Sequence, residues 1–81
     1  MISLSKNSKL KPEDVIKKAV SFWGPKGYGL TIQEQEDCSV AFEGGGGGVN
    51  VSAAAAAKGT TVDVVAREWE SQAKDFMASL K

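Results

Sequence analysis

Apolar and polar residues alternate along five short stretches of the chain, and alternation with a period of two is typical of strands with one buried face. The apolar members of these stretches are Ile2 and Leu4, Leu30 and Ile32, Val40 and Phe42, Val49, Val51 and Ala53, and Val62 and Val64. Turn-forming residues separate the last four stretches, at 35–37, at 44–48 and at 58–59. The pattern therefore predicts an antiparallel sheet with one buried and one exposed face.

Two other segments have apolar residues at helical spacing. The first begins at Pro12, which suits the first position of a helix, and ends before Gly24-Pro25. Its apolar stripe consists of Val15, Ile16, Ala19, Phe22 and Trp23. The second predicted helix covers residues 67–80. Its apolar stripe consists of Trp69, Ala73, Phe76, Met77 and Leu80.

The elements follow one another in the order β-α-β-β-β-β-α, which predicts a single α+β domain over residues 1–81. An antiparallel sheet of four to five strands with both helices packed on one face buries every apolar stripe in two layers. The predicted core is Ile2, Leu4, Val15, Ile16, Ala19, Phe22, Trp23, Leu30, Ile32, Val40, Phe42, Val49, Val51, Val62, Val64, Trp69, Ala73, Phe76 and Leu80.

The opposite face of the sheet follows from the same alternation. It is predicted to carry Thr31, Gln33, Ser39, Ala41, Asn50, Ser52, Ala54, Thr61, Asp63 and Val65. These side chains are short, nearly uncharged and include no Lys or Arg, whereas exposed strands commonly carry charges that prevent unwanted pairing. We therefore expect a binding or interaction module that forms a homodimer through this outer face or through an edge strand.

Five consecutive glycines occupy positions 44–48. A phosphate-binding loop would lead into a helix, whereas Val49-Asn50-Val51 continues as a strand, so the run is predicted to be a hairpin turn. Free backbone N–H groups at Gly45, Gly46 and Gly47 also make an anion-binding nest an alternative. Two glycines suffice for a tight turn, so the others indicate either close packing against another backbone or tolerated slack.

Composition narrows the classes of protein. The 81 residues have a net charge of zero and a pI of about 6.2, whereas a nucleic-acid-binding domain is usually strongly basic, so nucleic acid is not an expected partner. The six lysines within residues 1–27 are interpreted as a solvated helix face. No apolar run approaches the length of a membrane span. The single Cys38 cannot form an internal disulfide, which favours a cytoplasmic location.

Candidate catalytic chemistry is sparse. The chain has no histidine, which removes the commonest general base and most zinc sites, so we expect no enzyme, no metal and no cofactor. Glu34 and Glu36 share the alternation of Ile32 and would point toward the helices, where a carboxylate pair performs acid–base chemistry; the simpler interpretation is that both are solvated. Cys38 shares the alternation of Val40 and is predicted to be a small buried residue.

The aromatic residues suggest a second function. Trp23 and Trp69 lie on helical stripes and are expected in the core, whereas Tyr28 lies in a glycine-rich loop and is free to contact a ligand. The alternative to self-association is therefore the binding of a small apolar ligand between the sheet and the C-terminal helix. The residues predicted to line that site are Tyr28, Trp69, Phe76 and Ala53.

Several segments carry a resemblance. They are Phe42-Glu-Gly-Gly-Gly-Gly47, Val49-Asn-Val51, Thr60-Thr-Val-Asp-Val64, Arg67-Glu-Trp-Glu70 and Lys74-Asp-Phe76. Together they resemble small uncharacterised prokaryotic proteins of similar length, which implies no known activity. The order of elements alone resembles the helix-grip layout of Bet v 1-like domains, which implies a sheet wrapped against a C-terminal helix and a ligand between them.

Overall fold

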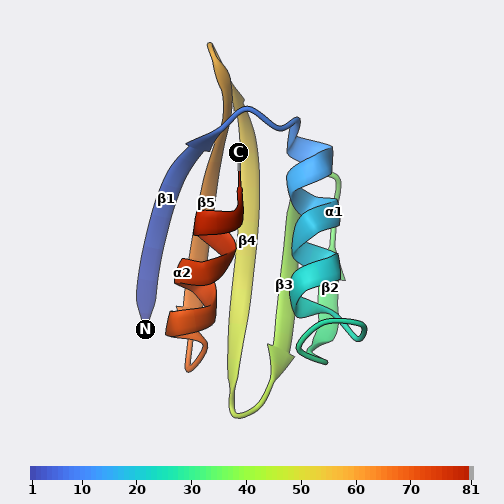
Figure 1. Cartoon of the computed structure of the whole chain (residues 1–81). Coiled ribbons are helices and arrows are strands. Elements are labelled where there is room, and N and C mark those ends of the chain that lie inside the picture. The colour runs from blue at the N-terminus through green and yellow to red at the C-terminus, as the bar shows by residue number, and fades with distance from the viewer. Residues whose placement is uncertain (81) are drawn as a thin grey trace.

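The elements occur in the order that the sequence predicts, and the α+β class is confirmed. The computed structural model, shown in Figure 1, describes residues 1–80. Its elements are β1 (Ile2–Ser8), α1 (Pro12–Trp23), β2 (Thr31–Gln35), β3 (Ser39–Gly44), β4 (Gly47–Ala56), β5 (Gly59–Arg67) and α2 (Glu70–Ser79). The five strands form one antiparallel sheet in the order β1-β5-β4-β3-β2, so that β4 is the central strand.

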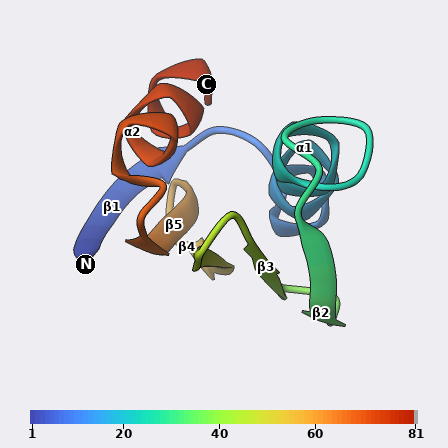
Figure 2. The same cartoon turned by 90° about the horizontal axis from the view of Figure 1, so that it is seen from below.

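Both helices lie on the same face of the sheet, as Figure 2 shows. Helix α1 packs on β3 and β4, and helix α2 packs on β1 and β5. The other face of the sheet is left without a covering layer. We call it the outer face.

The core lies between the sheet and the two helices. Trp23 and Phe76 are its largest fully buried members, one from each helix. Every residue of the predicted core is either buried or packed against the buried cluster. Ala53 and Ala66 join them, because the alternation of β4 and β5 continues beyond the valines. Met77 joins them from the apolar stripe of α2.

The predicted start of the second helix at residue 67 is wrong. Strand β5 continues to Arg67, which pairs with Gly48 of β4, and α2 begins at Glu70. Between them, Glu68 has a φ of 71°, a left-handed conformation that turns the chain from the strand into the helix. Pairing with a neighbouring strand therefore overrides the helical spacing at 67–69.

The alanine run forms the other long hairpin. Strand β4 extends through Ala56, which pairs with Gly59 of β5, so Ala57 and Lys58 form the turn. The turn predicted at 58–59 therefore lies one residue earlier, at 57–58.

Lys6 does not belong to a solvated helix face, because it lies on β1 and binds the end of helix α2. Lys18 is exposed on α1, as predicted, and also reaches the end of α2. Lys6 of β1 donates from Nζ to the carbonyl oxygens of Met77 at 2.8 Å and Leu80 at 3.0 Å. Lys18 of α1 donates to the Ser79 carbonyl oxygen at 3.3 Å. The last turn of α2 has no basic residue of its own, so lysines from other elements satisfy its carbonyl groups and complement the helix dipole.

Candidate functional site

The glycine run forms a tight turn between β3 and β4, as predicted. Gly44 pairs with Gly47, which leaves a two-residue loop. The two loop residues, Gly45 and Gly46, have φ values of 60° and 84°. Two successive left-handed residues are the requirement of a type I′ hairpin turn, in which glycine has no steric cost.

Close packing against neighbouring atoms, and not unused space, accounts for Gly45 in the turn and Gly47 beside it. The Trp69 indole lies so close to Gly45 that an added Cβ would be 2.6 Å from its Cζ2 atom, and its Nε1 donates to the Gly44 carbonyl oxygen at 2.9 Å. A Cβ on Gly47 would collide with the Arg67 carbonyl oxygen. The hairpin therefore fits against the connection between β5 and α2, with no space for a side chain at Gly45 or Gly47.

A shallow cavity opens on the outer face beside this hairpin. Glu43, Gly48 and Arg67 form one row across β3, β4 and β5. Because Gly48 has no side chain, the Arg67 guanidinium lies over it, with Nη2 3.4 Å from the position of a Cβ. The cavity has a volume of about 440 Å³, and we call it the Gly48 hollow. It is lined by Met1, Gln33, Ala41, Phe42, Glu43, Gly48, Asn50, Val65 and Arg67.

The charges of the Gly48 hollow have no partners within the described chain. Over residues 1–80, neither the Arg67 guanidinium nor the Glu43 carboxylate makes an ion pair or a side-chain hydrogen bond. Neither Arg67 nor Glu43 is among the outer-face residues predicted from the sequence. Continuing the alternation of β5 two positions past Val65, and that of β3 two positions past Ala41, would have found them.

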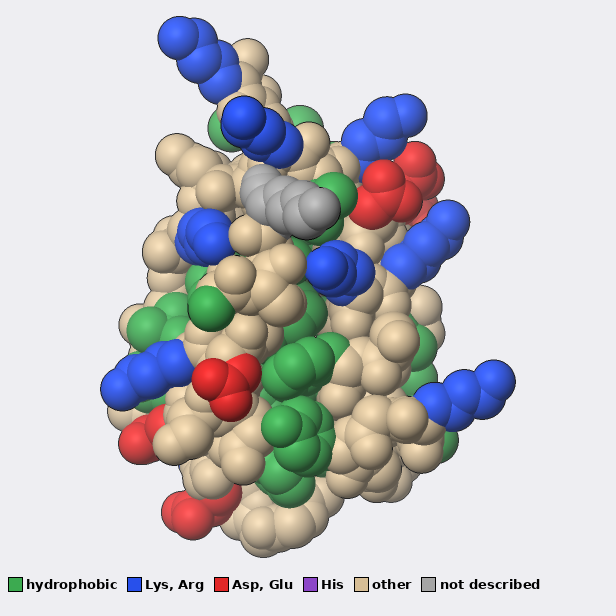
Figure 3. Space-filling view, in the orientation of Figure 1, with side chains coloured by type: hydrophobic (Ala, Val, Ile, Leu, Met, Phe, Trp, Pro, Cys, Tyr) green, Lys and Arg blue, Asp and Glu red, His purple; other side chains and the backbone are tan. Residues whose placement is uncertain are grey.

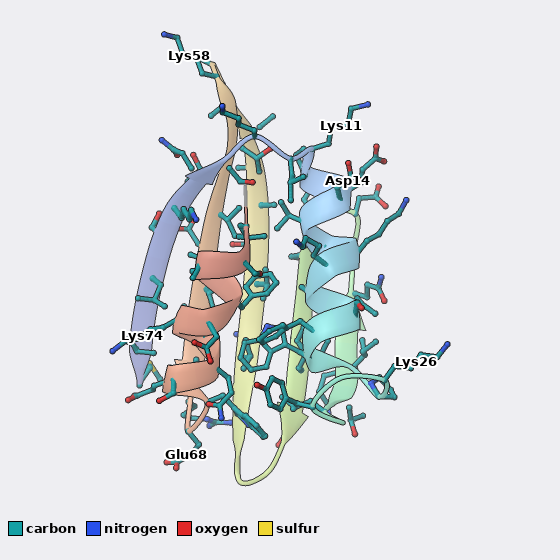
Figure 4. The ribbon with its side chains drawn as sticks, in the orientation of Figure 1. Lys11, Asp14, Lys26, Lys58, Glu68 and Lys74 are labelled. Carbon is teal, nitrogen blue, oxygen red and sulfur yellow. The ribbon has the colours of Figure 1, made fainter. Side chains whose placement is uncertain are left out.

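The predicted anion nest lies at a second cavity of about 340 Å³ on the other side of the turn. Gly46 and Gly47 line it together with Arg67, which favours an anion, and with Glu43 and Glu68, which oppose one. Figure 4 shows Glu68 at this end of the molecule, beside the hairpin. A nest at Gly45, Gly46 and Gly47 stays a prediction.

The rest of the outer face agrees with the alternation, since every residue predicted to lie there is exposed or partly exposed. The expectation that the face is nearly uncharged is wrong. Glu34 and Glu43 join Asp63 on it, and Arg67 is the one basic residue at the outward positions of the strands.

Glu34 and Glu36 are both exposed, which confirms the simpler interpretation, and the alternative in which they point toward the helices is wrong. A β-bulge between Ile32 and Glu34 shifts the register, so that Glu34 pairs with Ala41. One extra residue in a strand moves the following side chains to the opposite face. Both carboxylates line a cavity of about 270 Å³ that they share with outer-face residues of β4. Within residues 1–80, no cluster of three or more acidic, Cys or His side chains suits a metal ion.

Cys38 is exposed and free, so the prediction of a buried cysteine is wrong. Strand β3 begins at Ser39, and Cys38 lies in the preceding turn, where its carbonyl oxygen accepts a hydrogen bond from the backbone N–H of Ala53. The alternation of β3 does not extend into that turn.

The predicted ligand-binding aromatic residues come together between the helices. Tyr28 lies 5.6 Å from Trp69 between ring centroids, and Trp23 lies 6.2 Å from both Trp69 and Phe76. Figure 3 shows hydrophobic side chains gathered between α1 and α2, and Figure 4 shows rings occupying this space. Tyr28 is 46% exposed, whereas Trp23 and Phe76 are fully buried.

Ala53, the fourth predicted member of that site, lies elsewhere. It is buried in strand β4, where it pairs with Val62, and it takes no part in the ring contacts of the aromatic cluster. The aromatic cluster contains one buried polar atom whose hydrogen-bonding capacity is unused. The buried Trp23 Nε1 has no hydrogen-bond partner among the described residues.

Comparisons with known proteins add no family. No family model, curated protein or solved structure matches this chain. The two resemblances noted in the sequence therefore stay expectations. Among residues 1–80, neither helix has the length and apolar character needed to span a membrane.

Proposed function

We propose that this chain is a non-enzymatic interaction module that self-associates by packing its outer sheet face on the same face of a second copy. The observation that supports this proposal most strongly is the composition of that face. Its central residues are Asn50, Ser52 and Ala54 on β4, with Ala41 and Val65 beside them. Short side chains on a regular antiparallel sheet suit the face-to-face packing of two sheets about 10 Å apart.

The size of the face also suits a second copy. The Cα atoms extend 36 Å along the longest axis and 21 Å across it, so a face of these dimensions offers roughly 800 Å², the contribution of each partner to a standard interface. A small domain buries a modest fraction of its surface, so covering this face adds stability that the thin core lacks.

The edges of the sheet are less suited to pairing than its face. Edge strand β2 has only five residues and contains the bulge after Ile32. Edge strand β1 carries Lys6, whose charged group is held beneath α2. Bulges, short strands and inward-pointing charges are common protections of edge strands, so we place the contact on the face.

Light scattering of the purified chain from low to high micromolar concentration tests this proposal. We expect the mass of a dimer at the higher concentrations. Ser52→Lys, at the centre of the outer face, should give a monomer. The same substitution at Ser21, exposed on α1, is the matched control and should leave the dimer intact. A monomeric wild-type chain at every concentration overturns the proposal.

A small ligand at the aromatic cluster is the second candidate. Its specific support is that the buried Trp23 Nε1 has no hydrogen-bond acceptor among the described residues and lies beneath the partly exposed Tyr28. A buried N–H without an acceptor destabilises the fold by about 1–3 kcal/mol, and a ligand that supplied an acceptor would remove that cost. Native mass spectrometry of the chain from cell extract distinguishes the candidates. A retained small molecule supports this function, and a ligand-free dimer supports the first.

Cellular location is part of the same proposal. Cys38 is an exposed free thiol, and such a thiol suits a reducing compartment, so we place the module in the cytoplasm.

A further inference from the structure

The arrangement of residues on the outer face also suggests how two copies align. Strand β4 is the middle of the five strands, with β5 on one side and β3 on the other. We infer that the two-fold axis of the dimer runs along β4 in the plane between the two sheets, so that β5 of each copy lies over β3 of the other. This inference rests on the proposed self-association.

The row through Gly48 is the first argument for this axis. Arg67 and Glu43 flank Gly48 at equal distances of one strand on either side. Rotation about this axis therefore places the backbone position of Arg67 of one copy over that of Glu43 of the second, and the reverse. In the single chain the Arg67 guanidinium lies over Gly48, close to the axis, so in the dimer it turns away from the guanidinium of the other copy to reach the Glu43 carboxylate. Both groups have no ion-pair partner within residues 1–80, and the two-fold contact supplies one to each.

The next two rows also match under this rotation. Val65 of β5 and Ala41 of β3 flank Asn50, so an apolar side chain faces an apolar side chain across the interface. In the third row, Asp63 and Ser39 flank Ser52. The Ser39 hydroxyl of one copy is thereby placed to donate a hydrogen bond to the Asp63 carboxylate of the second.

The residues on the axis give an independent argument. A residue on a two-fold axis faces its own counterpart, so a charged side chain there would face a like charge. The outward positions of β4 from 48 to 54 are occupied by Gly48, Asn50, Ser52 and Ala54, and none carries a charge. Asparagine and serine both donate and accept hydrogen bonds, so each can pair with its own copy. The charged residues of the face belong to β2, β3 and β5 and not to β4.

Charge reversal tests the pairing. Each single substitution, Arg67→Glu or Glu43→Arg, places like charges together twice in the dimer, and we expect the dimer dissociation constant to rise by at least about 100-fold. The double variant restores opposite charges and should return to within about 10-fold of the wild type. Sedimentation equilibrium measures all four constants. A double variant as weak as the single variants, or single variants as tight as the wild type, overturns the inference.

Cross-linking tests the axis without changing the charges. In a Cys38→Ser background, Ser52→Cys places a thiol on the axis, whereas Ser5→Cys places one in the same row on β1. Strand β1 lies two strand spacings from β4, so the two copies of Ser5 would be about 19 Å apart across the axis. A short bismaleimide linker should join the Ser52→Cys copies and leave the Ser5→Cys copies unlinked. Efficient linking at Ser5→Cys, or none at Ser52→Cys, overturns the inference.

The outcomes separate this inference from the proposed function. A wild-type chain that is monomeric in the sedimentation experiment removes both. A wild-type dimer that is insensitive to charge reversal, or that links through Ser5→Cys, removes only the axis along β4 and leaves self-association standing.

Discussion

The close fit of the glycine hairpin makes a sharp prediction about two neighbouring residues. Gly47 does not have a positive φ, so alanine can adopt its backbone conformation, but the new Cβ would collide with the Arg67 carbonyl oxygen and lie 2.6 Å from the Glu68 Cβ. Gly46 has a φ of 84° and open space around its Cβ position. The two substitutions therefore separate the cost of contact from the cost of conformation.

The magnitudes follow from these surroundings. Gly46→Ala should cost about 1 kcal/mol, because the left-handed conformation costs about 1–2 kcal/mol and the loss of chain entropy in the unfolded state returns part of it. Gly47→Ala should cost about 3 kcal/mol or more, because its neighbours are backbone atoms that cannot rotate away. At roughly 4–8 °C per kcal/mol for a domain of this size, Gly47→Ala should lower Tm by more than about 12 °C.

Thermal and urea denaturation followed by circular dichroism measure both variants. Each is compared with the wild type at one protein concentration, because self-association would make Tm depend on concentration. Equal stabilities for the two variants, or a less stable Gly46→Ala chain, would refute the close packing of the hairpin against β5.

Four further substitutions test other contacts of the fold. Lys6→Met should lower the free energy of unfolding by about 2 kcal/mol in a urea titration, because it removes two charge-assisted hydrogen bonds to the end of α2. Lys18→Met should lower it by less than about 0.5 kcal/mol in the same titration, because the hydrogen bond of Lys18 is longer and exposed. Trp69→Phe should cost about 1 kcal/mol through the hydrogen bond to Gly44, with amide exchange in the hairpin accelerated. Cys38→Ser should change stability by less than about 0.5 kcal/mol, because the thiol is exposed; a loss of several kcal/mol by denaturation would show that it is buried.

The sheet, its two-layer packing and most of its core could be predicted from period and turn chemistry. Alternation is a local property, and it stayed reliable wherever a strand was regular. It failed for Glu34, because a bulge inserts one residue and moves the following side chains to the other face. It failed for Cys38, because the turn before β3 ends one residue later than the alternation suggests.

Long-range contacts account for the remaining differences. Residues 67–69 have a helical pattern, yet Arg67 pairs with Gly48, which is nineteen positions earlier in the chain. The hydrogen bonds of Lys6 to the end of α2 span more than seventy positions. Neither the pairing of Arg67 with Gly48 nor the contacts of Lys6 are visible in local spacing, because both depend on how distant segments come together in the fold.

Intermolecular nuclear Overhauser effects between methyl groups test the central claim most directly. In a mixture of isotope-labelled and unlabelled chains at high micromolar concentration, the outer-face dimer predicts intermolecular cross-peaks from the methyl groups of Ala41 and Val65. With the axis along β4, the Ala41 methyl group of one copy contacts the Val65 methyl groups of the other. Ala78, exposed on α2 on the opposite side, should give no intermolecular cross-peak. Cross-peaks from Ala78 with none from Ala41 or Val65, or no intermolecular cross-peaks at all, would contradict self-association through the outer face.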